Sequence, residues 1–195
     1  LEDPDINLEF TVAEKSSYYQ ILWNKDEQKN LMIGVTTNGL VKVIDKNTVE
    51  GYEVYQNKVK VFFYLKTEKS FSSDSIWNAE NKSETGIAEL TGSKPTVALS
   101  FQIAEKAKTG VKMGVSFVDA EQARKNLESD IPDWNFELLK DKGRKRWNEA
   151  LGKIKVEGGT NDQKIVFYTA LYRNYERMVN ISENGRYYSG FDDSI

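Results

Sequence analysis

Alternation of apolar and polar residues is the feature that most restricts the fold of this chain. Between Leu8 and Phe117 apolar side chains recur at every second position, most clearly over residues 59–65, 97–103 and 111–117. A period of two is typical of half-buried β-strands, because successive side chains point to opposite faces. We expect about nine antiparallel strands that share one interior, with lysines and serines facing outward. The predicted fold is mainly β with C-terminal helices, and its strands form an antiparallel β-sandwich.

Short polar stretches separate the predicted strands. Asn38-Gly39 is the strongest hairpin signal, because a type I′ turn needs positive φ at both central residues. Further turns are predicted at residues 24–26, 45–47, 56–58 and 92–95, which are rich in Asn, Asp and Gly.

Residues 70–85 are rich in Ser, Asn, Asp and Glu, and we expect a long surface loop there. Trp77 lies within this stretch and has two interpretations. It could be a platform on which a sugar ring stacks, or a tryptophan packed over the edge of the sandwich.

The period changes at Val118, where a helical pattern begins. Asp119 is a candidate N-cap with Gln122 at the capping-box position, which predicts a helix over residues 120–129 that ends before Pro132. A second helix is predicted from about Trp134 to Gly152, with an apolar stripe along one side.

The tryptophans of this region, Trp134 and Trp147, are suited to fixing the orientation of a β domain relative to a helical one. We interpret both as structural residues. The basic cluster at residues 140–145 is interrupted by Asp141 and Gly143 and is predicted to be a solvated helix face.

Residues 157–175 give the clearest helix signal in the chain. Gly158 and Gly159 precede Thr160, an N-cap candidate, and Gln163 completes a capping box. From Ile165 onward the helix has almost no polar face, which is typical of burial on most sides. We therefore expect the first helix of a helical domain that this chain does not contain. The predicted division is 1–118, a partial N-terminal β-sandwich domain; 119–156, a helical linker; and 157–195, the start of a helical barrel.

Composition excludes several functions for the chain itself. The 195 residues include no cysteine and no histidine, which excludes disulfides, thiol nucleophiles, Ser-His-Asp triads and His-ligated zinc. A net charge of −3 without a basic run argues against a nucleic-acid partner. No run of about 18 apolar residues predicts a membrane span. Because the chain begins at Leu1 rather than Met, we expect a processed or truncated start.

Asp192 and Asp193 are the carboxylate pair nearest to a possible chemical role. Inverting glycosidases use an acid and a base roughly 6.5 to 9.5 Å apart, and paired carboxylates also bind calcium. The alternative is a polar turn after Gly190, which the local composition favours.

Three stretches together resemble the family 92 glycoside hydrolases, which are calcium-dependent exo-acting α-mannosidases common in gut Bacteroidetes. The stretches are residues 111–136 (VKMGVSFVDAEQARKNLESDIPDWNF), 146–173 (RWNEALGKIKVEGGTNDQKIVFYTALYR) and 184–195 (NGRYYSGFDDSI). The resemblance implies an N-terminal sandwich, linker helices and an (α/α)6 barrel, with inverting chemistry where the two domains meet. It also implies that residues 160–179 form the first barrel helix.

The same resemblance places the functional residues mostly elsewhere. The family's acid, base and calcium-binding carboxylates are expected downstream of Ile195, so no catalytic residue, metal ligand or cofactor is expected in this chain. Arg186, Tyr187 and Asp192 lie in a motif near the family's cleft and are the candidate substrate-proximal residues, with Trp77 as a fourth. Asp193 stands where the family pattern has a glycine, so the motif is imperfect.

Two functions of different classes follow. The first is a fragment of a secreted or periplasmic α-mannosidase acting on terminal mannose, α-1,2-linked in N-glycans or mannans, with no activity as a free chain. The second is a carbohydrate-binding or assembly module that uses the sandwich face and Trp77. In either case the apolar helix at residues 157–175 could bury Phe167, Leu171 and Tyr172 against another copy.

Overall fold

The computed structural model describes residues 6–24, 29–56, 58–79, 88–104, 106–175 and 179–195. Its strands are β1 (Ile6–Val12), β2 (Ser16–Trp23), β3 (Lys29–Gly34), β4 (Asn38–Asp45), β5 (Thr48–Tyr55), β6 (Val59–Thr67), β7 (Ser72–Trp77), β8 (Glu89–Ser93), β9 (Thr96–Phe101) and β10 (Lys108–Ser116). They form a seven-stranded sheet of order β1-β2-β10-β6-β5-β4-β8 and a three-stranded sheet of order β3-β9-β7. Every described pairing is antiparallel. The predicted antiparallel sandwich is confirmed.

The main core lies between the two sheets. Val97 and Leu99 of β9 are fully buried and pack in one cluster with Val41, Val49 and Phe63 of the larger sheet. These are residues of the alternating stretches, so the period-two pattern identified the inward side chains of β9 and of the centre of β6 correctly.

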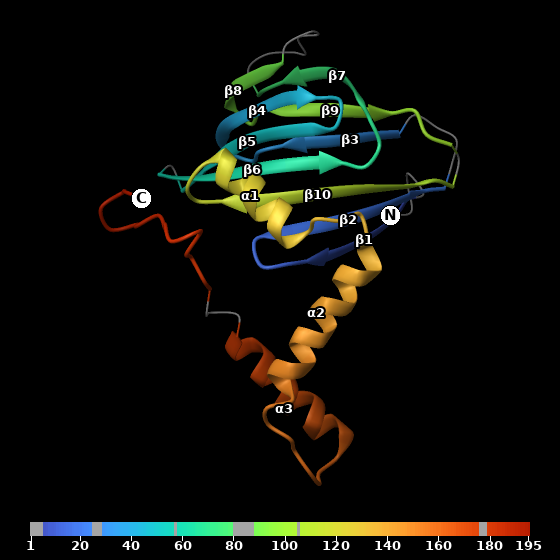
Figure 1. Ribbon diagram of the computed structural model, residues 1–195, viewed down its shortest axis with the longest axis vertical. Coiled ribbons are helices and arrows are strands. Elements are labelled where there is room, and N and C mark those ends of the chain that lie inside the picture. Colours follow the sequence, from blue (N-terminus) through green and yellow to red (C-terminus); the bar gives the residue numbers. More distant parts are fainter. Residues whose placement is uncertain (1–5, 25–28, 57, 80–87, 105, 176–178) are drawn as a thin grey trace.

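A second core covers the opposite face of the seven-stranded sheet. Helix α1 (Ala120–Asp130) and the start of α2 (Phe136–Leu151) bury a cluster that includes Tyr18, Tyr64 and Leu127. Figure 1 shows α1 lying across this sheet. The prediction that lysines and serines face outward is therefore wrong on β10. Lys112 is 5% exposed and Ser116 is 1% exposed, because helices cover the face on which they lie.

Lys112 is held by two groups in this second core. Its Nζ donates to the Ile131 carbonyl at 2.9 Å and lies 4.1 Å from the centre of the Trp134 ring. Burial, with Lys66 nearby, lowers the pKa of Lys112. Trp134 also meets Tyr18 edge to face, with ring centroids 5.7 Å apart, as expected for a residue that fixes the helices to the sandwich.

The glycines of β10 bring the helices close to the strand. An added Cβ on Gly114 would lie 2.3 Å from the Ala123 carbonyl oxygen, and one on Gly110 would lie 2.9 Å from the Trp134 ring. Both glycines share the strand face of Lys112, since alternate residues point the same way. Only strand residues without a side chain allow this approach.

Tyr18 gives this core a pH dependence. Burial, reinforced by the charge of Glu68, raises the pKa of Tyr18 to about 12. Between pH 10 and pH 12 the folded protein keeps a proton that the unfolded chain loses, so stability is fully present below pH 10 and falls as pH rises to 12. We expect Tyr18→Phe to reduce this loss in urea titrations at pH 9, 10 and 11. An identical pH dependence in wild type and Tyr18→Phe would contradict the assignment.

The predicted hairpin at Asn38-Gly39 is wrong. Both residues lie within β4, where Gly39 pairs with Glu53 on one side and Gly92 on the other. The chain passes from β3 in the smaller sheet to β4 in the larger one, so no hairpin joins them. The turn at residues 46–47 does connect β4 to β5, and Gln56 lies next to the β5–β6 turn with φ of 49°.

The predicted surface loop at residues 70–85 is also wrong for its first part. Ser72–Trp77 form β7, an edge strand that pairs with β9. Ile76 is 2% exposed and faces the core, whereas Ser72 is exposed, and the polar composition of this strand resembles that of a loop. Residues 80–85 lie outside the described residues.

Two helices extend from the sandwich. Figure 1 shows α2 projecting away from the sheets and α3 (Asn161–Tyr175) packing beside its far end. Trp147 of α2 lies 4.6 Å from the ring of Tyr172 of α3. Tyr168 accepts from the Val156 amide and donates to the Ile154 carbonyl. Helix α3 thus contacts α2 through aromatic rings and contacts the connecting segment through the Tyr168 hydroxyl.

The capping box of α3 is confirmed. The Thr160 amide donates to Gln163 Oε1 at 2.8 Å, and the Gln163 amide donates to Thr160 Oγ1 at 3.3 Å. None of the residues of α3 is buried in this chain, although the helix is apolar on nearly all sides. The described helix ends at Tyr175, and residues 176–178 lie outside the described residues. No described helix is long and apolar enough to span a membrane.

Candidate functional site

After α3 the chain returns to the sandwich, and Glu183 fastens it there. The side chain of Glu183 is 3% exposed. One carboxylate oxygen accepts from the Phe117 amide at 3.0 Å, and the other accepts from Asn126 Nδ2 at 2.8 Å. Asn126 also donates to the Val115 carbonyl. Glu183 therefore joins the C-terminal segment to the end of β10 and to α1 through one buried carboxylate.

Arg186 makes the second connection to α1. Its backbone pairs with Glu183 in both directions, at 2.7 Å and 3.1 Å, which closes a tight turn. Its guanidinium donates to Gln122 Oε1 at 3.1 Å and lies 3.7 Å from Asp119 Oδ2. Since both partners of this ion pair are about half exposed, the ion pair itself adds little stability.

The predicted capping box of α1 is half correct. Asp119 is the N-cap and accepts from the Gln122 amide at 2.6 Å. The Gln122 side chain is 1% exposed and binds Asn126 and Arg186. Asn126 one turn along the helix and Arg186 of the C-terminal segment have replaced the local partner that the capping box assumes.

Contacts with the β1–β2 turn hold the start of the same segment. Lys15 Nζ donates to the Asn180 carbonyl at 2.7 Å, and Asn180 Nδ2 donates to Glu14 Oε1 at 3.1 Å. The Lys15 amide donates to Asp130 at the end of α1. The turn, α1 and the C-terminal segment thus meet at one joint.

Three of the predicted site residues meet beyond this joint. Arg186, Tyr187 and Asp192 line one open pocket of about 380 Å³, together with Gly185, Ser189, Ser194 and Ile195. The pocket therefore has one guanidinium, one carboxylate, two serine hydroxyls and one tyrosine ring in its lining. Such a set offers hydrogen-bond donors and acceptors to a polyhydroxylated ligand.

The residues 189–194 form a compact turn that presents Asp192. The Ser189 amide donates to the Ser194 carbonyl at 2.8 Å, and the Asp193 amide donates to the Ser189 carbonyl at 3.0 Å. Asp193 adopts φ of 59°, a conformation that favours glycine, which fits the family pattern at this position. The Tyr188 hydroxyl donates to Asp193, and this hydrogen bond raises the pKa of Tyr188.

The charge state of Asp192 limits its chemistry. Hydrogen bonds from Ser189 and Ser194 hold the pKa of Asp192 below its usual value. A general acid for glycosidic cleavage needs the opposite, a carboxyl whose pKa is raised. Asp192 is therefore suited to accepting hydrogen bonds from a ligand as a carboxylate. The polar-turn interpretation of Asp192 and Asp193 fits this geometry.

The fit of a calcium ion can be tested on the side chains present. The described part of the chain brings together no group of three or more Asp, Glu, His or Cys side chains that could hold a metal. Calcium needs six to eight oxygen ligands. The residues described here do not supply such a set, and we derive no step through calcium in this chain.

Trp77 does not belong to the same pocket. It is the last residue of β7, pairs with Thr96 and is half-buried in the three-stranded sheet. Its position at a sheet edge agrees with the structural interpretation.

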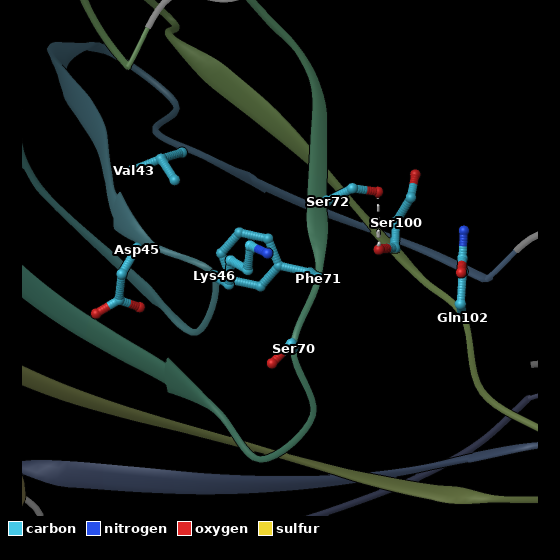
Figure 2. Close-up of a pocket in the computed structure, with 8 residues that line it drawn as sticks. All are labelled: Val43, Asp45, Lys46, Ser70, Phe71, Ser72, Ser100 and Gln102. Atoms are coloured by element: carbon cyan, nitrogen blue, oxygen red, sulfur yellow. Dashed lines mark hydrogen bonds between the residues drawn. The ribbon is translucent and has the colours of Figure 1, made fainter.

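A larger open pocket of about 500 Å³ lies at another edge of the sandwich, shown in Figure 2. Asp45 and Lys46 line one side, and Ser100 and Gln102 line the other. Its one aromatic ring, Phe71, is 6% exposed and belongs to the main core, so it presents no face on which a sugar could stack. This pocket offers no support for a sugar-binding sandwich.

Sequence reasoning missed Glu183 and Asn126 as residues that fasten the C-terminal segment, and it assigned Gln122 only to the capping box of the first helix. Gln122 and Asn126 are four residues apart and so share a helix face, which was a usable signal for a polar patch on α1. No local pattern marks Glu183, because both of its side-chain partners lie more than 50 positions away.

Comparison with known proteins identifies the fold. A fungal relative from Arthroderma benhamiae, described as an uncharacterized secreted glycosidase, is 27% identical over 202 residues, covering 87% of this chain and 26% of that protein. An inverting mannosidase of family 92 from Bacteroides thetaiotaomicron superposes with a TM-score of 0.85 at 20% identity, over 97% of this chain and 27% of its own. A second α-mannosidase of that family and organism gives 0.86 at 20% identity, over 100% and 28%.

These figures show that the chain spans about a quarter of the length of the proteins it matches. The family model for the glycosyl hydrolase family 92 N-terminal domain matches residues 1–116, and the model for its catalytic domain matches residues 122–195. The second match begins within α1, so Glu183 and Arg186 hold the end of the catalytic-domain match against its own beginning on α1 and against residues 117–119, which follow the N-terminal match. The first match alone covers more than half of the chain, and the resemblance seen in the sequence is confirmed: the chain belongs to glycosyl hydrolase family 92.

Proposed function

We propose that the full-length protein containing this chain is an α-mannosidase that removes terminal mannose, α-1,2-linked in N-glycans or mannans, by an inverting mechanism. One observation carries the proposal. The two domain matches of one hydrolase family follow each other along a chain whose fold is that of mannosidases in the same family. Within this proposal, residues 1–195 supply part of the sandwich, the connecting helices and the start of the catalytic domain.

The proposal places Arg186, Tyr187 and Asp192 beside the substrate and the acid and base outside this chain. An inverting reaction needs one carboxyl that protonates the leaving oxygen and one carboxylate that activates water. The lowered pKa of Asp192 supports a binding role over an acid role. Hydrogen bonds to sugar hydroxyls are the role for which the pocket's side chains are equipped.

The activity test separates this chain from the full-length protein. We expect the 195-residue protein to give no turnover of aryl α-mannosides or α-1,2-mannobiose in the presence of calcium. The full-length protein is expected to hydrolyse both and to release β-mannose first, as seen by proton NMR of the fresh product, because the attack inverts the anomeric carbon. Turnover by residues 1–195 alone would refute the placement of the acid and base outside this chain. Release of α-mannose as the first product would refute the inverting mechanism.

Calcium and location belong to the same proposal. We infer that calcium binds the full-length enzyme through residues beyond those described, so that a chelator should abolish its activity and added calcium restore it. We also propose an extracellular or periplasmic location, which the fungal relative's description as secreted supports.

The competing sugar-binding interpretation predicts a response of Trp77 to mannose. We expect no saturable change in tryptophan fluorescence when mannose is added to residues 1–195, since Trp77 ends an edge strand and lines no pocket described above. Trp77→Phe is the control, because it removes the signal of this indole alone. A saturable change that disappears in Trp77→Phe would favour the binding module.

Self-association through α3 stays a proposal for the isolated chain. Ile165 is 63% exposed and Val166 is 68% exposed on this helix. Apolar surface of this kind is usually covered in a native assembly. Sedimentation of residues 1–195 over a range of concentrations measures it directly, and a constant monomer mass would exclude it.

A further inference from the structure

Lys112 lies where the sandwich and its two connecting helices meet. Its side chain leaves the middle of β10 and is 5% exposed. The ammonium group donates to the carbonyl of Ile131, which is the C-cap of α1, and lies over the ring of Trp134, two residues before α2. One buried cation thus holds both sides of the connection between the helices. We call this connection, residues 131–135, the corner.

The corner suits a cation in two ways. The carbonyl groups at a helix C-terminus carry partial negative charge, which favours a lysine there. The face of an aromatic ring also attracts a cation, more strongly when the cation is buried. Tyr18 of β2 packs edge to face on Trp134 and Phe136, with ring centroids 5.7 Å and 5.3 Å apart, and closes the site on that side. An apolar side chain in place of Lys112 would satisfy neither the carbonyl nor the ring.

Helix α2 depends on the corner for its direction. Of its sixteen residues only Phe136 and Leu139 are buried, and both lie in the first turn. Figure 1 shows the rest of the helix projecting away from the sheets. Further along, an ion pair joins Arg146 to Glu14 of the β1–β2 turn, but the Arg146 side chain is 75% exposed and such pairs contribute little. The angle at which α2 leaves the sandwich is therefore set at its base.

A small change at the base of α2 becomes a large one at its far end. A helix rises about 1.5 Å per residue, so α2 is about 24 Å long, and a tilt of about 10° moves its far end by about 4 Å. That end holds α3 through the rings of Trp147 and Tyr172. Residues 179–195 carry the pocket and do not follow this movement, because Glu183 and Arg186 fasten them to α1 and to the end of β10. A tilt at the corner therefore changes the position of α3 relative to the pocket.

We propose that Lys112 is a positioning residue of the mannosidase reaction, which fixes the corner and, through α2, the start of the catalytic domain relative to the pocket of about 380 Å³. The inference rests on the proposed function, in which the acid and base that must meet the bound sugar lie beyond this chain. Misplacing reacting groups by about 1 Å can cost about 100-fold in rate. Lys112 does not line the pocket and acts only through the position of α2.

The first measurement determines the direction of α2 in residues 1–195. The chain contains no cysteine, so Lys42→Cys on β4 and Lys145→Cys on α2 place two spin labels at exposed sites. Double electron–electron resonance on the monomer fraction should give one narrow distance distribution. In Lys112→Met we expect the distribution to shift or broaden by about 4 Å, because the corner has lost its anchor. Trp134→Leu, a milder change that removes only the ring, should act in the same direction.

The matched control is Lys66→Met. Lys66 pairs with Lys112 from the neighbouring strand β6 and faces the same side. Among the residues that the structure describes, it has no hydrogen bond or ring contact with the corner. This substitution removes a lysine from the same face and should leave the distance distribution unchanged.

The second measurement uses the full-length protein and separates a positioning role from a purely structural one. Methionine removes the charge itself and leaves no unpaired ion in the core, so we expect Lys112→Met to stay folded at the assay temperature, as checked by circular dichroism. Its kcat on aryl α-mannosides should fall about 100-fold while KM changes less than about threefold, because the catalytic groups are displaced from a sugar that still binds. Lys66→Met should keep both constants.

An unchanged distance distribution in both Lys112→Met and Trp134→Leu would overturn the proposal, whatever the enzymatic result. A shifted distribution with unchanged kcat in an active full-length enzyme would also overturn it, because the corner would then have no part in the reaction. A wild-type full-length protein without mannosidase activity would reject the proposed function and with it the role of Lys112 in the reaction. The distance measurement would still show whether Lys112 sets the direction of α2.

Discussion

Gly114→Ala is expected to lower the free energy of unfolding by about 3 kcal/mol, the upper end of the usual cost of overpacking a core. The new Cβ would lie 2.3 Å from the Ala123 carbonyl oxygen and 2.8 Å from Leu127 Cβ. The nearest of these atoms is backbone of α1 and cannot rotate away. Either α1 moves off β10 or the strand bends, and both separate Leu127 from the second core.

The matched control is Gly143→Ala in α2. No atom lies within 4 Å of a Cβ added there, and the position is inside a helix. Alanine should therefore stabilise by about 0.5 to 1 kcal/mol, because glycine is a poor helix former. Urea unfolding followed by circular dichroism measures both variants. Similar free energies for the two variants would show that α1 does not lie as close to β10 as described.

Glu183→Ala is expected to release the C-terminal segment at a cost of about 3 kcal/mol. Hydrogen bonds to a buried charged group contribute roughly 1.5 to 3 kcal/mol each and are not additive. The substitution leaves the Phe117 amide and the Asn126 side-chain amide without their acceptor. When the segment opens, the backbone pairing between residues 183 and 186 is lost, and Arg186 moves away from Gln122. The measurement should therefore report opening at this segment rather than global unfolding.

Trypsin cleavage after Arg186 reports that opening. A local stability loss of about 3 kcal/mol corresponds to cleavage about 100-fold faster when opening is rapid. Glu121→Gln is the control. Glu121 is an exposed carboxylate on α1, and its hydrogen bond from Arg124 lowers the pKa of Glu121 to about 2. Glu121→Gln should leave cleavage at Arg186 nearly unchanged. An unaltered cleavage rate in Glu183→Ala would mean that Asn180 and Lys15 hold the segment without Glu183.

Gly114→Ala and Glu183→Ala both act on contacts of α1, where the N-terminal match ends and the catalytic-domain match begins. Gly114 sets the distance of α1 from the sheet, and Glu183 sets the position of the pocket-bearing segment relative to α1. We expect each of the two substitutions to reduce the proposed mannosidase activity of the full-length protein, although neither residue belongs to the substrate pocket.

Local patterns in the sequence determined much of the fold. Alternation predicted the inward residues of β9, and the capping signals at Asp119 and Thr160 predicted where α1 and α3 begin. Each of these signals depends on side chains within a few positions of one another, and short-range sterics and hydrogen bonds decide them.

The same patterns failed where distant segments compete. Asn38-Gly39 has the composition of a hairpin turn, but pairing with Glu53 and Gly92 places it inside β4. The serine-rich composition of β7 is typical of a loop, yet pairing with β9 makes that stretch a strand. Backbone pairing with a remote strand overrides the local preference in both cases.

The chain sequence by itself determined the sandwich class, the helix starts and the resemblance to a hydrolase family. Only the tertiary structure decided that helices cover the second face of the larger sheet. It also gathered Arg186, Tyr187 and Asp192 around one pocket and buried Glu183 beneath α1. The physical reason is that periodicity reports which side of an element is apolar, whereas burial depends on which distant element packs against that side.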